Sequence, residues 1–171
     1  MKKTFLILLA ILIAGTSIAF FVFNCKVTEV KISNDVIGQI IKENVEPIAS
    51  KKLYGKDQHF GDKIFCEYTI IVAEEKYGEI KVYLNIWYEE FYVEAGILKQ
   101  GSGAECPTVL HLKKQDNSYI FKNVDISTAP ASSDAIKIFP MRIRNNYDIY
   151  KQSFSSDADL QKRAKEHFNL N

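Results

Sequence analysis

A long uncharged run at the N-terminus constrains this chain more than any other feature of its sequence. Lys2 and Lys3 are followed by residues 4–24, which carry no charge and are predominantly apolar. A helix that crosses a bilayer needs about 20 such residues, and about 18 already make a candidate. The two lysines favour a cytoplasmic N-terminus. We therefore predict a transmembrane anchor in residues 1–25, which crosses the cell membrane through residues 4–23, and one extracytoplasmic domain in residues 26–171.

Two other interpretations of the N-terminal run stay open. A cleaved secretory signal would end at the small residues Ser17-Ile18-Ala19, but such apolar regions usually run for about 7–15 residues and this one continues through residues 20–23. A lipoprotein modified at Cys25 is the third interpretation, although residues 22–24 lack the small side chains that this processing normally requires. The anchor and the secretory signal both place residues 26–171 outside the cytoplasm, and a cleaved chain would be secreted.

The length and charge of the chain restrict the remaining classes. The 171 residues fit one domain of about 100–150 residues with an appendage. The net charge is +1, from 22 basic and 21 acidic residues, and there is no long basic run. Proteins that bind nucleic acid usually carry a basic patch or stripe. We therefore predict no nucleic-acid partner.

The periodicity of the apolar residues predicts an α+β domain. From Val36 to Ile48 they recur at three- and four-residue steps, which indicates an amphipathic helix capped by Asn34 or Asp35, interrupted at Pro47 and ending near Leu53. β-branched and aromatic residues then predict strands. The strands are expected at Ile64–Glu74, Ile80–Val93, Thr108–Lys114 and Tyr119–Ile126, with turns at Lys76–Glu79 and Gln115–Ser118 and a break at Ala95-Gly96 followed by a short extension over Ile97–Gln100. The expected fold is one amphipathic helix packed on a curved antiparallel meander sheet, with short helices at Ser132–Phe139 and at Leu160–Phe168 near the C-terminus.

The cysteines and glycines in this sheet have two interpretations each. Cys66 and Cys106 form no C-x-x-C motif, and outside the cytoplasm they are a candidate disulfide. The favoured alternative is that Cys66 is a small buried hydrophobic residue in a strand. Gly101-Ser102-Gly103 lacks the spacing of a phosphate-binding loop, so we expect a wide connection between strands.

The sequence predicts no catalytic residues, metal or cofactor. His59, His111 and His167 are widely separated, whereas zinc sites need three or four converging ligands. Glu89 and Glu90 are neighbours in a strand, so their side chains point to opposite faces and cannot act together on one substrate. One carboxylate inside an aromatic-lined pocket remains the basis for an alternative, a small enzyme with a general base.

The aromatic strand carries the candidate ligand-binding residues. Tyr83, Trp87 and Phe91 share one face with Glu89, whereas Tyr88 and Tyr92 belong to the other face. One face packs on the helix, because a sheet needs a covered face. The second row is either a binding surface or a further part of the core or of a dimer interface. The candidate binding residues are Tyr83, Trp87, Glu89 and Phe91.

A set of motifs between Tyr83 and Pro140 resembles a known family. The motifs are Tyr88-Glu89-Glu90-Phe91-Tyr92, Gly101-Ser102-Gly103 with Pro107, Val109–Lys113, and Ile136-Lys137-Ile138-Phe139-Pro140. The stretch is similar to a small extracytoplasmic domain of Gram-positive bacteria. That domain occurs alone on membrane anchors or signal peptides, or appended to zinc-metallopeptidase antirepressors of the β-lactam-sensor type. The resemblance implies a cone-shaped α+β domain of the cystatin-like or nuclear-transport-factor-like type.

The chain departs from the family pattern after its last strand. Relatives carry Tyr-Trp, then Pro and an Arg-Asp-Gly turn, whereas residues 125–133 here read Asp-Ile-Ser-Thr-Ala-Pro-Ala-Ser-Ser. The peptidase itself is missing, because the chain has no H-E-x-x-H motif. We therefore expect a membrane-anchored binding or interaction module, accessory to envelope sensing, whose partner is a small ligand, a peptide or another envelope protein.

Overall fold

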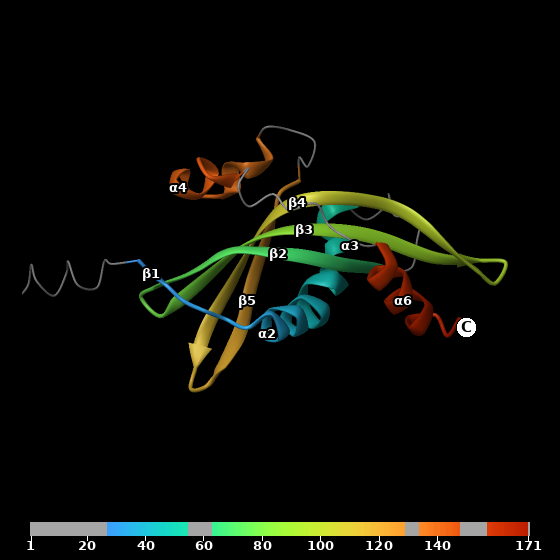
Figure 1. Ribbon diagram of the computed structural model, residues 1–171, viewed down its shortest axis with the longest axis horizontal. Helices are drawn as coiled ribbons and strands as arrows, with labels where there is room; N and C mark the ends of the chain where they lie inside the picture. The colour runs from blue at the N-terminus through green and yellow to red at the C-terminus, as the bar shows by residue number, and fades with distance from the viewer. Residues whose placement is uncertain (1–26, 55–62, 129–133, 148–156, 171) are drawn as a thin grey trace, which may run out of the picture.

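The computed structural model describes residues 27–54, 63–128, 134–147 and 157–170. Its fold is α+β with an antiparallel sheet, as the sequence predicts (Figure 1). The sheet has five strands in the order β1-β2-β3-β4-β5, and its first strand, at Thr28–Glu29, was not among the expected ones. Within these four segments, no helix is both long enough and apolar enough to cross a bilayer. The predicted anchor in residues 1–25 lies outside them, as does His59.

The sheet is a meander in which each strand pairs with its neighbour in sequence. Its strands are β1 Thr28–Glu29, β2 Lys63–Lys76, β3 Glu79–Glu94, β4 Ile97–Gln115 and β5 Ser118–Ile126. Two-residue turns join β2 to β3 and β3 to β4, and both residues of each turn have positive φ: 56° and 77° at Tyr77-Gly78, and 50° and 77° at Ala95-Gly96. Such turns match the right-handed twist of the flanking strands. The predicted turn at Lys76–Glu79 is confirmed. At Ala95-Gly96 the chain reverses in a hairpin, so Ile97–Gln100 begins β4 and pairs back on β3, and the expected short extension of the preceding strand is wrong.

The amphipathic helix forms in three consecutive parts. These are α2 Asn34–Ile40, a π-helical turn η1 Ile41–Val45, and α3 Glu46–Tyr54. Ser33 caps α2 through a hydrogen bond from the Val36 N–H to its hydroxyl at 3.4 Å, one residue before the expected cap. Pro47 is the second residue of α3 and has no N–H to donate to the preceding turn of the helix. The expected interruption therefore takes the form of a π-helical turn just before the proline.

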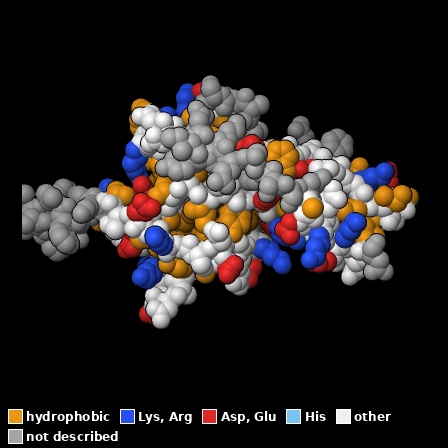
Figure 2. Space-filling model, in the orientation of Figure 1, with side chains coloured by type: hydrophobic (Ala, Val, Ile, Leu, Met, Phe, Trp, Pro, Cys, Tyr) orange, Lys and Arg blue, Asp and Glu red, His pale blue; other side chains and the backbone are white. Residues whose placement is uncertain are grey.

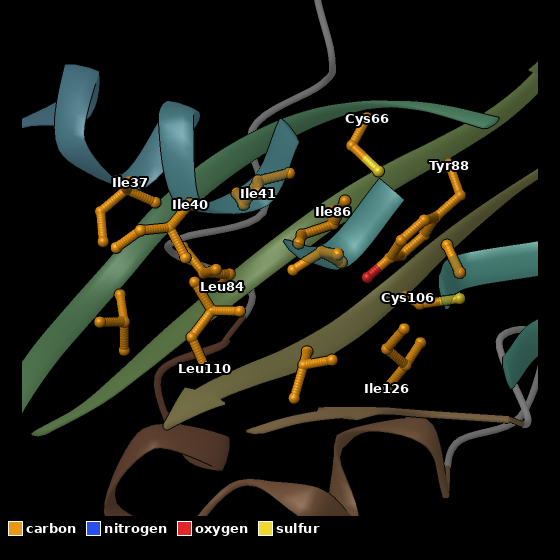
Figure 3. Packing of buried hydrophobic residues seen from close by; sticks show 14 of the residues in the cluster. Ile37, Ile40, Ile41, Cys66, Leu84, Ile86, Tyr88, Cys106, Leu110 and Ile126 are labelled. Carbon is orange, nitrogen blue, oxygen red and sulfur yellow. The ribbon is translucent and has the colours of Figure 1, made fainter. Parts of the chain in front are cut away.

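The inner face of the sheet packs on this helix and forms the main core. Side chains of β3 alternate between the two faces, and the inner row consists of Ile80, Val82, Leu84, Ile86 and Tyr88. Figure 3 shows Leu84 and Ile86 of this row facing Ile37, Ile40 and Ile41 of the helix. All five members of the inner row are at most 1% exposed.

Two smaller clusters cover the ends of the outer face. Near the β2–β3 turn, a 3-10 helix η2 Ala135–Ile138 and a short helix α4 Met141–Arg144 pack on Tyr83 and Val109. Toward the opposite end of the sheet, helix α6 Asp157–His167 packs on Phe65 and Phe91 through Leu160 and Ala164. Figure 1 shows α4 and α6 at these two ends. The expected helices near Ser132–Phe139 and Leu160–Phe168 are thus present, although residues 129–133 lie outside the described segments.

The segment from Gly101 to Pro107 is part of β4, so the expected wide connection is wrong. Pairing with β3 continues through this segment, with a bulge between Glu89 and Phe91. The glycines allow buried side chains of β3 to lie against the β4 backbone, because a Cβ at Gly101 would stand 2.7 Å from Glu90 Oε2. Pro107 is tolerated because pairing with β5 starts one residue later, at Thr108.

Charged side chains form hydrogen bonds with backbone groups of β2 and β5, at the two sides of the sheet. On β2, the Cys66 N–H donates to Glu46 Oε1 at 2.9 Å, and Arg163 Nη1 donates to the Cys66 carbonyl at 3.0 Å. Arg163 Nη2 also donates to Glu46 Oε1 at 2.5 Å, which joins α3, β2 and α6 in one arrangement that we call the edge clamp. On β5, Lys52 donates to the Val124 carbonyl. Such contacts oppose pairing with a further strand.

Candidate functional site

The four predicted binding residues share the outer face of β3 but do not form one site. Tyr83 is 5% exposed and packs against Phe139 at a ring distance of 5.7 Å. Phe91 is 1% exposed and packs against Phe65 at 5.8 Å. These two side chains therefore belong to the cores of separate clusters. Trp87 is hydrogen-bonded to Glu89 and packs against the margin of the cluster that contains Phe91, whereas Tyr83 belongs to the other cluster.

Trp87 and Glu89 form a fixed pair. The indole N–H of half-buried Trp87 donates to Glu89 Oε2 at 2.6 Å, and Glu89 is only 3% exposed. Gly103 lies opposite Glu89 on β4, and a Cβ there would stand 2.8 Å from both Glu89 Oε2 and Trp87 Cζ2. A glycine at position 103 is therefore required for the pair to lie against the strand.

A second polar pair lies beside the first. Asn85 is fully buried, and its side-chain amide donates to Glu105 Oε1 at 2.7 Å. The Tyr147 hydroxyl donates to Asn85 Oδ1 at 2.9 Å. Sequence reasoning missed Asn85, Glu105 and Tyr147. The available signal was Asn85 itself, a polar residue between the apolar stretches Val82–Leu84 and Ile86–Tyr88, on the same face as Trp87.

The strand register surrounds Trp87 with carboxylates. Glu67 on β2 and Glu105 on β4 are its direct cross-strand neighbours, and Glu89 is the next residue on the same face of β3. Directly opposite residues in an antiparallel pair lie about 4.5–5.5 Å apart at Cβ. We call Glu67, Asn85, Trp87, Glu89 and Glu105 the outer-face group. Trp87, Glu67 and Glu105 are half-buried in this group, and the Glu89 carboxylate is buried beside the indole ring.

Glu90 does not belong to this group. It is 1% exposed, and its carboxylate accepts a hydrogen bond from the Ser102 N–H at 3.3 Å. Glu89 instead bonds to Trp87 on the outer face. The two neighbouring carboxylates therefore have different partners, in agreement with the alternation of a strand.

The described histidines occupy unlike environments. His111 Nε2 lies 2.7 Å from Asp125 Oδ2 on the neighbouring strand. His167 packs edge-on against Phe65 at 5.8 Å and against Phe168 at 4.9 Å. In the segments that the structure describes, no group of three or more His, Cys, Asp or Glu side chains is arranged to hold a metal ion.

Cys66 and Cys106 are free thiols in the inner core. They lie on β2 and β4, with β3 between them, and Figure 3 shows them on either side of Tyr88. Two strand spacings are about 9.5 Å, whereas disulfide Cα atoms lie at most about 6.8 Å apart. The candidate disulfide is therefore incompatible with this register. Cys66 instead lies buried in the inner core, in agreement with the favoured alternative of a small buried hydrophobic residue in a strand.

Burial of these thiols predicts a loss of stability at alkaline pH. Desolvation raises the pKa of Cys106 to about 12, and that of Cys66 well above its ordinary value. An unfolded thiol ionises near pH 8.5, so above that pH the unfolded state loses a proton that the folded state keeps. Between pH 8 and pH 10, the wild-type protein should lose about 2 kcal/mol more unfolding free energy than the Cys106→Ala variant. Urea titrations at both pH values measure this difference, and equal losses in the two proteins would contradict it.

Comparison of the chain with known protein families, with characterised proteins and with solved structures gives no match.

Proposed function

We propose that the chain is a membrane-anchored extracytoplasmic binding module that recognises its partner through the outer-face group. The observation that carries this proposal is the half-buried Trp87, held by Glu89 and flanked across the sheet by Glu67 and Glu105. Hydrogen bonds hold Glu89 to Trp87 and Glu105 to Asn85 before any ligand arrives. A preorganised site loses less conformational entropy on binding than a mobile one.

The chemistry of the outer-face group favours a positively charged ligand group. The face of an indole ring attracts ammonium and guanidinium ions, and carboxylates at its margin add Coulombic attraction. The ligand would present an amine, a quaternary ammonium or a guanidinium group, either in a small molecule or in a Lys or Arg side chain of another envelope protein. The interaction with the ring alone contributes about 0.5–2 kcal/mol.

The N-terminal run and the family resemblance complete the proposal. The anchor in residues 4–23 would hold the domain at the outer surface of the cell membrane. A helix on one face of an antiparallel meander is compatible with the cone-shaped domain that the resemblance implies. A role accessory to envelope sensing follows from the same resemblance.

A small enzyme that uses Glu89 as a general base is the second candidate. The observation in its favour is the burial of this carboxylate beside an aromatic ring. The two candidates differ in the effect of Glu89→Gln. In an enzyme this change abolishes turnover and leaves binding largely intact, whereas in a binding module it weakens binding of the cation.

The fluorescence of Trp87 tests the proposed function, because it is the only tryptophan of the chain. Choline and arginine methyl ester should change the emission of the full-length protein in a saturable manner, and an uncharged isostere of choline should not. Glu105→Gln should weaken this binding about fivefold, because it removes about 1 kcal/mol of attraction at a partly exposed position. The matched control is Glu79→Gln, at an exposed position on the same strand as Trp87. Equal responses to charged and uncharged probes, or equal weakening by the control, would refute the proposal.

A further inference from the structure

Exposed apolar side chains collect at the end of the domain where the N-terminal run enters. Among the described residues, five large hydrophobic side chains are exposed: Val27, Tyr77, Ile97, Ile120 and Met141. Val27, Tyr77 and Met141, at 41%, 63% and 63% exposure, all belong to this end. Figure 1 shows β1, the β2–β3 turn and α4 together there, with α6 and the C-terminus at the opposite end.

Two of these residues, Val27 and Tyr77, border one groove, and Met141 is next in sequence to residues that line it. Val27, Tyr77 and Pro140, which precedes Met141, line a cavity of about 330 Å³ together with charged side chains. The basic members of the lining are Lys76, Lys81 and Arg142, and the acidic members are Glu74 and Glu79. Figure 2 shows hydrophobic, basic and acidic side chains side by side at this end. We call this surface the entry face.

The chemistry of the entry face suits the boundary between lipid and water. Tyrosine favours this boundary because its ring is apolar and its hydroxyl is polar. Lys76 Nζ lies 5.1 Å from the centre of the Tyr77 ring, so the turn presents an aromatic ring and an ammonium group together. Long basic side chains can bury their methylene groups while their charges reach lipid phosphates.

The length of the connecting chain restricts where this face can lie. The uncharged run ends at Asn24, three residues before Val27. Three residues span at most about 11 Å. With the run inserted in a bilayer, Val27 is therefore held close to the headgroups. A tether this short gives the entry face a high effective concentration at the lipid surface, so that weak contacts are populated.

We infer that the entry face rests on the outer surface of the membrane, with Val27, Tyr77 and Met141 in the headgroup region. This inference depends on the anchor of the proposed function. It identifies the membrane itself as the occupant of the entry face and orients the domain. The β3–β4 turn at Ala95-Gly96 then points away from the lipid, and the outer-face group lies along the side of the domain.

The test uses full-length protein in phosphatidylcholine–phosphatidylglycerol vesicles that contain lipid brominated close to the headgroup. In a Trp87→Phe background, Tyr77→Trp places a single tryptophan at the entry face, and Ile97→Trp places one beside the opposite turn, where Ile97 is 59% exposed. Met141→Trp is a second probe of the entry face. Emission from Tyr77→Trp and Met141→Trp should fall about twofold or more relative to vesicles without bromine, and emission from Ile97→Trp should remain unchanged.

Flotation of the same vesicles separates two kinds of failure. Protein that does not float with lipid refutes the anchor and this inference together. Protein that floats but shows no quenching of Tyr77→Trp and Met141→Trp refutes the inference alone. Quenching of Ile97→Trp to the same extent also refutes it, because the domain would then have no fixed orientation.

Discussion

Replacing Arg163 with alanine should lower the free energy of unfolding by about 3 kcal/mol, the largest effect that we expect from one charged residue. Arg163 donates to both Glu46 and the Cys66 carbonyl, and Glu46 is 3% exposed. Removing the guanidinium leaves the Glu46 carboxylate buried without its counter-charge, and leaves the Cys66 carbonyl without the Arg163 hydrogen bond. Denaturant unfolding at neutral pH measures the change.

The matched control is Arg142→Ala. Arg142 also pairs with a glutamate, Glu74, but its side chain is 51% exposed. Exposed pairs contribute about 0–1 kcal/mol, so this variant should stay within about 1 kcal/mol of wild type. If the two arginine variants were equally stable, the edge clamp would have no special energetic role.

Replacing Phe91 with alanine should cost about 3–4 kcal/mol of unfolding free energy, because it removes a fully buried ring and leaves a cavity. Phe91 is 1% exposed, between Phe65 and helix α6. The change should destabilise the domain as a whole and weaken cation binding only through unfolding. Thermal denaturation measures the first effect, and titration of the protein that remains folded measures the second.

Ile97→Ala is the control for this core position. Ile97 lies on β4 at the same end of the sheet but is 59% exposed. Surface changes of this kind usually stay within about 0.5 kcal/mol. If the Phe91→Ala variant had wild-type stability but did not bind the cation, Phe91 would be a ligand-binding residue and not a core residue.

Local patterns were sufficient to predict the meander and its helix. Alternation along residues 80–88 and the three- and four-residue steps of residues 36–48 each depend only on neighbours in sequence. The turn at Tyr77-Gly78 is likewise local, because it requires positive φ. These features are confirmed in the structure.

The function of the glycines in β4 was not predictable from local patterns. Gly101 and Gly103 are normally signals of a loop. Here they remain in the strand because Glu90 and Glu89 of the neighbouring strand occupy the space that a side chain would fill. This requirement depends on the register between β3 and β4, which the sequence does not state.

The candidate site was predicted only in part for the same reason. Because side chains alternate along a strand, the sequence placed Trp87 and Glu89 on one face of β3, as the structure has them. The alternation of side chains alone did not show that Phe139 covers Tyr83 and that α6 covers Phe91. Glu105 and Tyr147 lie 20 and 62 positions from Asn85 in the sequence. Their hydrogen bonds to Asn85 therefore become apparent only in the folded structure.

The edge clamp also has a consequence for the order of folding. A meander assembles from contacts between sequence neighbours, so each hairpin can form as soon as its second strand is available. Glu46 and Arg163, however, are 117 residues apart, and the arginine belongs to α6, which follows all five strands in sequence. During synthesis the sheet can therefore pair before its β2 edge is closed. A chain that has been synthesised only as far as β5 therefore lacks the Arg163 contacts to Glu46 and to the Cys66 carbonyl.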